Sequence, residues 1–194
     1  MTTQDKQERS EWRIKMIDWQ RTASKLAEKY FVGKVDKGGH SYLGHLWRVA
    51  DAVAKEKEST VEDSFSTLGK FYDKAFIVAL LHDIVEDTKV TLDMLREEGF
   101  DEEIISAIDA ISRRKDEQYY FDFISRVKKN DIAKIVKIHD LEDNMDITRL
   151  QEFGDYEQKR LKKYWYCWKY LKDELGPFGD IKCNNTIHPD RKFR

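Results

Sequence analysis

Proline, the strongest helix breaker among the amino acids, is almost absent from this chain. The 194-residue sequence has two prolines, Pro177 and Pro189, and both lie near its C-terminus. Almost everything upstream is therefore free to form helix. A chain of this length usually forms about one domain, and residues 178–194 have no apolar period. The sequence predicts an all-α fold, a compact helical bundle formed by residues 1–176, followed by a flexible C-terminal tail at 177–194.

The charges of the chain are nearly balanced. Lys and Arg number 35 and Asp and Glu number 37, which gives a formal net charge of −2. Non-specific binding to nucleic acid depends on an excess of cationic charge, so we expect no nucleic-acid partner. The longest apolar run, residues 75–81, is far shorter than the roughly 20 residues that span a bilayer, and the polar N-terminus has no signal-peptide core. We expect a cytoplasmic protein without membrane contact, with Cys167 and Cys183 as free thiols.

Apolar residues recur at helical spacing along most of the chain. Side chains that can cap a helix N-terminus precede three of these segments: Ser10, Thr91 and Asp101. The stretch AFIVALLHDIVEDT (75–88) is apolar on all sides for two turns and then turns acidic, which is typical of a helix at the centre of a bundle. The sequence predicts helices at about 10–31, 42–57, 75–88, 91–99, 101–111, 116–130, 131–146 and 156–175.

The pair His82-Asp83 at the end of the apolar run is the sharpest local anomaly. An ionised carboxylate inside a protein is costly unless an opposite charge meets it, and a divalent cation would serve. Glu86 and Asp87 each follow this pair by four residues, so a helical path would place two more carboxylates roughly 6 Å further along the same side. The alternative is a helix end that reaches solvent with ordinary surface acids.

Two further segments supply residues of the same kind. His45 lies in the glycine-rich segment GGHSYLGHLWRVA (38–50), and Asp140 follows the apolar run in KIVKIHDLEDNMD (134–146). With His82 and Asp83 they make a set of two imidazoles and two carboxylates from three predicted helices. Such a set suits manganese, iron or zinc with open positions for water better than a thiolate site would.

These segments together resemble the HD-domain phosphohydrolases. HDIVED after the apolar run, the histidine within SYLGHLWRVA and the later VKIHDLEDN are similar to motifs of the hydrolase domain of the RelA/SpoT family and its small stand-alone relatives. The resemblance covers about residues 14–150. It implies an all-helical HD-domain bundle with a central buried helix. It also implies Mn²⁺-dependent hydrolysis of the 3′-pyrophosphate of guanosine 3′,5′-bis(diphosphate), ppGpp.

The resemblance also implies a role for individual residues. The family's metal ligands fall on His45, His82, Asp83 and Asp140. The acidic pair that positions and activates the attacking water falls on Glu86 and Asp87. The substrate-binding positions fall on Lys37, Tyr42 and Asn144. We expect Mn²⁺ as the cofactor, with Fe²⁺, Zn²⁺ and Mg²⁺ as alternatives because all tolerate overlapping nitrogen and oxygen ligands.

One departure from the family pattern concerns the substrate. Asp36 stands where the family usually has an arginine that would lie against a guanine, so the base preference stays open. An anionic substrate also needs cationic pocket walls, and the candidates besides Lys37 are Arg48, Arg113, Arg114, Lys115 and Arg149.

Two alternatives to the ppGpp hydrolase remain. One is a 5′-nucleotidase or another nucleotide phosphohydrolase with the same metal ligands. The other is a non-enzymatic helical module in which a cation only holds helices together and the last helix binds a partner, such as a second copy in a homo-oligomer. That helix has an aromatic face that could instead face the core: Leu161, Tyr164, Trp165, Trp168, Leu171 and Leu175.

Overall fold

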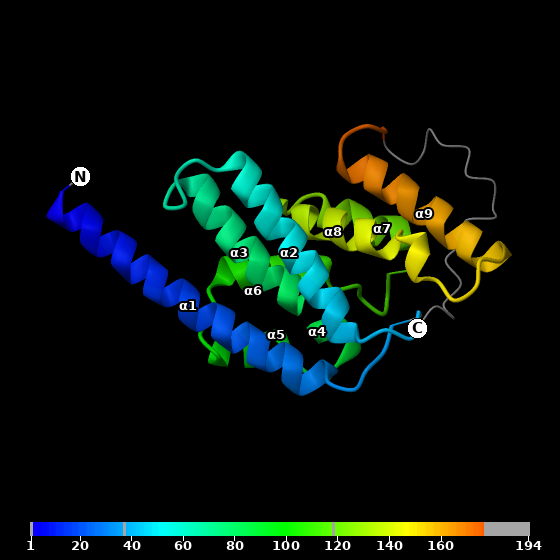
Figure 1. The fold of residues 1–194 in the computed structure, drawn as a ribbon, viewed down its shortest axis with the longest axis horizontal. Coiled ribbons are helices and arrows are strands. Elements are labelled where there is room, and N and C mark those ends of the chain that lie inside the picture. The colour runs from blue at the N-terminus through cyan, green and yellow to red at the C-terminus, as the bar shows by residue number, and fades with distance from the viewer. Residues whose placement is uncertain (1, 37, 118, 177–194) are drawn as a thin grey trace.

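The computed structural model describes residues 2–36, 38–117 and 119–176 and has an all-α fold (Figure 1). The compact helical bundle predicted from the sequence is therefore confirmed. Its elements are α1 (Thr3–Phe31), α2 (Tyr42–Thr60), α3 (Thr67–Leu81), α4 (Ile84–Asp87), α5 (Leu92–Glu97), α6 (Glu102–Ile111), α7 (Tyr120–Val127), α8 (Asp131–Asn144), the 3₁₀ turn η1 (Ile147–Arg149) and α9 (Asp155–Leu171). Lys37, Cys183 and the predicted tail at 177–194 lie outside the described residues.

Helix α3 lies at the centre of the bundle, as predicted for the apolar run. It packs against α1, α2, α6 and α8 (Figure 1). The last turns of α3, from Ile77 to Leu81, are completely buried. Since α2 and α8 both lie against α3, polar side chains near the C-terminal end of α3 meet side chains from these two helices.

The predicted caps explain two helix starts and fail at a third. Thr91 and Asp101 accept hydrogen bonds from the backbone N–H groups of Met94 and Ile104, as expected. Ser10 is not a cap, because α1 already begins at Thr3 with a capping box between Thr2 and Asp5. The first turns of α1 are polar and exposed, so apolar periodicity gave no signal for them.

Several other helix boundaries differ from the prediction, among them those of α3, α7 and α9. Helix α3 begins at Thr67 with Ser66 as its cap, eight residues before the apolar run. Helix α9 ends at Leu171 rather than at residue 175. Asp173 has a positive φ of 60° there and pairs with Lys128 and Lys134, each at 2.8 Å, which draws the chain away from the helix axis.

Helix α9 turns only part of its aromatic stripe to the core. Cys167 and Leu171 are buried, Tyr164 and Trp168 pack against the core, and Trp165 is 45% exposed. Of the predicted stripe, only part therefore faces inward. The buried side instead carries Arg160, which is 8% exposed.

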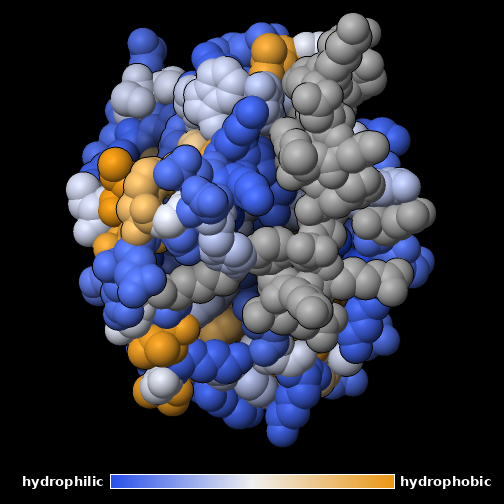
Figure 2. All heavy atoms as spheres, turned by 90° about the vertical axis from the view of Figure 1, so that its right-hand side faces the viewer, coloured by the Kyte–Doolittle hydropathy of each residue, from blue (hydrophilic) through white to orange (hydrophobic). Residues whose placement is uncertain are grey.

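Among the described residues, no helix combines the length and the apolar character needed to cross a bilayer. On the described part of the face in Figure 2, hydrophilic side chains predominate and hydrophobic ones form small separate groups.

Candidate metal centre

The backbone breaks where the sequence predicted a continuous helix through His82-Asp83. Helix α3 ends at Leu81, Asp83 has φ −102° and ψ 1°, and α4 starts at Ile84. Neighbouring residues of a regular helix point about 100° apart. The break allows the side chains of His82 and Asp83 to face one point. The predicted continuous helix from 75 to 88 is therefore wrong, and the break is what places both residues in the same cluster.

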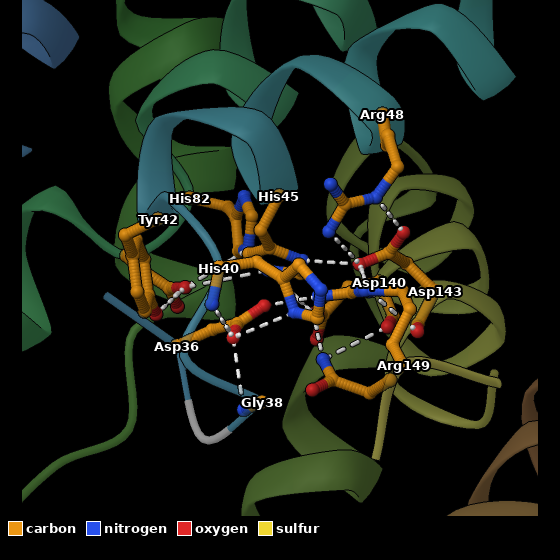
Figure 3. Close-up of polar contacts among 12 residues, drawn as sticks. Asp36, Gly38, His40, Tyr42, His45, Arg48, His82, Asp140, Asp143 and Arg149 are labelled. Carbon is orange, nitrogen blue, oxygen red and sulfur yellow. Dashed lines mark hydrogen bonds and ion pairs between the residues drawn. The ribbon is translucent and has the colours of Figure 1, made fainter. Parts of the chain in front are cut away.

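The four predicted metal ligands converge from α2, the α3–α4 junction and α8. Figure 3 shows three of them, His45, His82 and Asp140. His45 Nε2 lies 3.3 Å from His82 Nε2 and 3.2 Å from Asp140 Oδ1. His82 Nε2 lies 3.1 Å from Asp83 Oδ2 and 3.6 Å from Asp140 Oδ1. Donor atoms of His45, His82 and Asp83 lie within 4.8 Å of one another. The two imidazoles and Asp140 are buried.

Hydrogen bonds at the far side of each imidazole fix which nitrogen carries the proton. His82 Nδ1 lies 2.7 Å from the carbonyl oxygen of Ala79, and His45 Nδ1 lies 2.7 Å from Asp143 Oδ2. Since both partners are acceptors, each Nδ1 donates a hydrogen. In the neutral form of the ring, which is the form that binds a metal, the lone pair of Nε2 is then directed toward the other ring and toward the carboxylates.

The donor set fits a divalent cation. Ligand atoms about 2.1 Å from one ion lie roughly 3.0–3.5 Å apart at neighbouring coordination positions. Five of the six pairs among the four residues have contacts of 3.1–3.9 Å, the exception being Asp83 with Asp140, and all the facing atoms are acceptors when the imidazoles are neutral. Two carboxylates balance a charge of +2, so an ion at this point would relieve both the lone-pair repulsion and the buried negative charge.

The electrostatics keep the carboxylates of this cluster ionised. Burial acts to lower the pKa of His82, but Asp83 and Asp140 raise it well above its usual value, so this imidazole is charged while no ion is bound. Burial acts to raise the pKa of Asp83, but the charge of His82 and its hydrogen bond lower this pKa to about 2. Burial also acts to raise the pKa of Asp140, and Lys137 with the two imidazoles holds it well below the usual range. The Lys137 ammonium lies 2.7 Å from Asp140 Oδ2, which leaves Oδ1 for the cluster.

Glu86 and Asp87 line the pocket beside the cluster, although α4 is not a continuation of α3. Burial and the nearby charge of Asp83 raise the pKa of both. Glu86 Oε2 accepts a hydrogen bond from the Arg113 backbone N–H at 3.0 Å. Arg126 fixes this backbone by donating to the carbonyls of Asp109, Ala110 and Ser112 at the end of α6.

The predicted substrate residues bind the cluster itself. The Tyr42 hydroxyl lies 2.6 Å from Asp83 Oδ2 and 3.2 Å from Asp87 Oδ2, and its ring stacks on Phe31. The Asn144 amide donates to Asp140 Oδ1 at 2.6 Å. Both residues also line the pocket, so their predicted contact with a substrate stays a prediction.

The pocket has a volume of about 350 Å³ and a lining of mixed character. Acidic residues and the imidazole of His45 make up part of the lining. The rest includes cationic and aromatic residues from the loop after α6 and from α7, α8 and α9: Arg113, Tyr120, Phe123, Lys137, Arg160, Lys163 and Tyr164. The Arg160 Nε atom is buried without a hydrogen-bond partner among the described residues.

The predicted cationic walls are only partly present. Arg113 and Arg149 line the pocket, whereas Arg48 binds Asp143 and Arg114 binds Asp109 at the surface. Lys115 is not among the residues that line the pocket. Arg149 forms an ion pair with Asp36, so a guanidinium lies beside the position where the family resemblance expected one.

Sequence reasoning missed several pocket residues. Lys137 and Asp143 stand three residues before and after Asp140, so helical spacing could have found them. Arg160 and Lys163 are two among many charges in α9, and only the orientation of that helix distinguishes them.

Comparison with known proteins adds no support for the family resemblance. The chain matches no protein-family model and no curated protein sequence. The likeness to the HD-domain phosphohydrolases therefore remains a prediction from the motifs.

Proposed function

We propose that the protein is a metal-dependent phosphohydrolase of the HD type that acts on a nucleotide. The observation that carries the proposal is the convergence of two imidazole Nε2 atoms and two carboxylates on one point at the wall of a pocket. A structural cation needs no acids beyond its ligands. Here Glu86 and Asp87 add two carboxylates on the same wall, which favours an enzyme.

The proposed ligands are His45, His82, Asp83 and Asp140. When bound, a divalent ion such as Mn²⁺ supplies Lewis acidity and lowers the pKa of water. Glu86 and Asp87 orient the attacking water and accept its proton. Their raised pKa values favour this role, because a proton acceptor works best when its pKa is close to the working pH.

The cationic residues that line the pocket favour an anionic substrate. Arg160 and Lys163 of α9 face the pocket from one element, and Arg113 faces it from the loop after α6. Guanidinium groups bind phosphate through paired hydrogen bonds. The rings of Tyr120 and Tyr164 give the pocket an apolar surface on which a base can stack.

Within this class we propose hydrolysis of the 3′-pyrophosphate of ppGpp, with a 5′-nucleotidase or another nucleotide phosphohydrolase as the alternative. Incubation of the Mn²⁺-loaded protein with ppGpp, a nicotinamide dinucleotide phosphate, and nucleoside mono- and triphosphates separates them. Pyrophosphate released from ppGpp supports the proposal, whereas orthophosphate released from monophosphates supports the alternative. Stoichiometric Mn²⁺ without turnover of any member would indicate a structural ion and contradict the enzyme.

A further inference from the structure

Asp143 stands at the far side of His45 from the proposed ion. Its Oδ2 atom accepts the hydrogen of His45 Nδ1 at 2.7 Å, and its side chain is only 11% exposed. Arg48 approaches the same carboxylate through two nitrogens, Nε at 2.6 Å from Oδ1 and Nη2 at 3.1 Å from Oδ2. Arg149 donates to Oδ2 and to the Asp143 backbone carbonyl (Figure 3). One carboxylate thus receives one imidazole and two guanidinium groups.

We propose that Asp143 is a positioning residue of the metal centre, which fixes the tautomer and the ring orientation of His45 while Arg48 and Arg149 hold Asp143 in place. This inference rests on the proposed metal centre. Imidazole can bind a metal through Nε2 only when that atom is unprotonated and aimed at the ion. A carboxylate hydrogen-bonded to Nδ1 meets both conditions, and such partners typically change metal affinity 10–100-fold when removed.

The two arginines give Asp143 a role that a plain surface ion pair does not have. Both guanidinium groups donate hydrogen bonds, so the carboxylate between them is kept as an acceptor toward His45. Helix geometry also matters, because Asp143 follows Asp140 by three residues on α8. One face of α8 therefore supplies a proposed metal ligand and the partner of another.

Arg149 extends this network to the loop between α1 and α2. Its guanidinium also pairs with Asp36, whose Oδ1 accepts the backbone N–H groups of Gly38 and His40 at 2.9 Å each. A Cβ atom on Gly38 would collide with the Arg149 carbonyl oxygen, so this close approach requires glycine. The loop that lines the pocket edge is thereby joined to His45 through Asp36, Arg149 and Asp143.

The test compares Mn²⁺ binding to the wild-type chain, to Asp143→Ala and to Asp109→Ala by isothermal titration calorimetry. Asp109 is the matched control, because it also pairs with an arginine, Arg114 at 2.9 Å, but does not line the pocket. We expect Asp143→Ala to weaken Mn²⁺ binding 10–100-fold and Asp109→Ala to change it less than about twofold. Arg149→Met should give a smaller loss than Asp143→Ala, since Arg48 still holds the carboxylate.

A second readout reports on the imidazole itself. In the Zn²⁺-loaded wild type, ¹⁵N NMR should show His45 with its hydrogen on Nδ1, and in Asp143→Ala this signature should be lost or mixed. If circular dichroism shows that Asp143→Ala is unfolded, Asp143→Asn keeps the shape of the side chain and is measured in its place.

The outcomes separate the inference from the proposed function. If the wild type binds no divalent ion, the metal centre is wrong and the role of Asp143 falls with it. If the wild type binds Mn²⁺ and the Asp143 variant binds it within about twofold with an unchanged His45 signature, only the role of Asp143 is overturned.

Discussion

Helices α6 and α8 pack against the same central helix α3, yet they bury different chemistry. The inner face of α6 is apolar throughout and consists of four isoleucines and two alanines: Ile104, Ile105, Ala107, Ile108, Ala110 and Ile111. The inner face of α8 carries Lys137, Asp140 and Asp143 among its apolar residues. Burial of apolar area on α6 stabilises the fold. Charges are costly to bury unless paired, and those of α8 are paired with one another, with His45 and with two arginines.

The largest effect is expected beside the charged cluster, where Glu86 lines the pocket. Glu86→Gln keeps an oxygen that can accept the Arg113 backbone N–H, so the fold and the Mn²⁺ content should be unchanged. Loss of a general base typically lowers the rate 10²–10⁴-fold. Turnover of whichever nucleotide the substrate panel identifies should fall by that factor, measured together with Mn²⁺ stoichiometry. Turnover within tenfold of the wild type would contradict the proposed role.

The apolar side of the comparison is tested by Ile108→Ala. Ile108 is completely buried in α6, and truncation of a buried isoleucine to alanine costs about 2–5 kcal/mol. Urea unfolding of the metal-free protein should show this loss, while Mn²⁺ affinity of the folded fraction should stay within about twofold. A large loss of Mn²⁺ affinity with little loss of stability would mean that α6 also shapes the metal centre.

The same contrast explains what the sequence could predict. The isoleucines of α6 and the caps Thr91 and Asp101 follow local rules, so that part of the fold was predictable. The proposed ligands His45, His82, Asp83 and Asp140 were singled out because their residue types are unusual beside apolar runs, and the structure brings their side chains together. The break at Asp83 and the orientation of α9 depend on tertiary packing, so neither the geometry of the HD pair nor Arg160 could be found from periodicity.

Acid should destabilise the charged cluster, in contrast with the apolar face of α6, by protonating Asp83. Its pKa in the folded protein is about 2, below the ordinary value of 3.8, because the charge of His82 outweighs burial. A lowered pKa stabilises the fold above the ordinary value, and this stability is lost as the pH falls toward 2. The loss corresponds to about 2 kcal/mol for this group.

Urea unfolding of the metal-free protein between pH 5 and pH 2 measures this effect. Asp83→Asn should remove about 2 kcal/mol of the pH-dependent fall, since the amide does not titrate in this range. An identical fall in both proteins would place the acid sensitivity elsewhere, for example at Asp143, whose pKa is also held low by His45 and Arg48 despite burial.

The smallest effect is expected for the charges on the outer side of α6. Asp109 and Arg114 form an ion pair at 2.9 Å with side chains 44% and 51% exposed. Exposed pairs contribute about 0–1 kcal/mol, because water screens them and both side chains lose freedom. Asp109→Ala should therefore change the free energy of urea unfolding by less than about 1 kcal/mol.

Asp143 also pairs with arginines but contacts His45 on the side away from the proposed ion, so its substitution should weaken metal binding far more than that of Asp109. Equal losses of Mn²⁺ affinity in the two variants would show that pairing with arginine, and not contact with His45, is what matters.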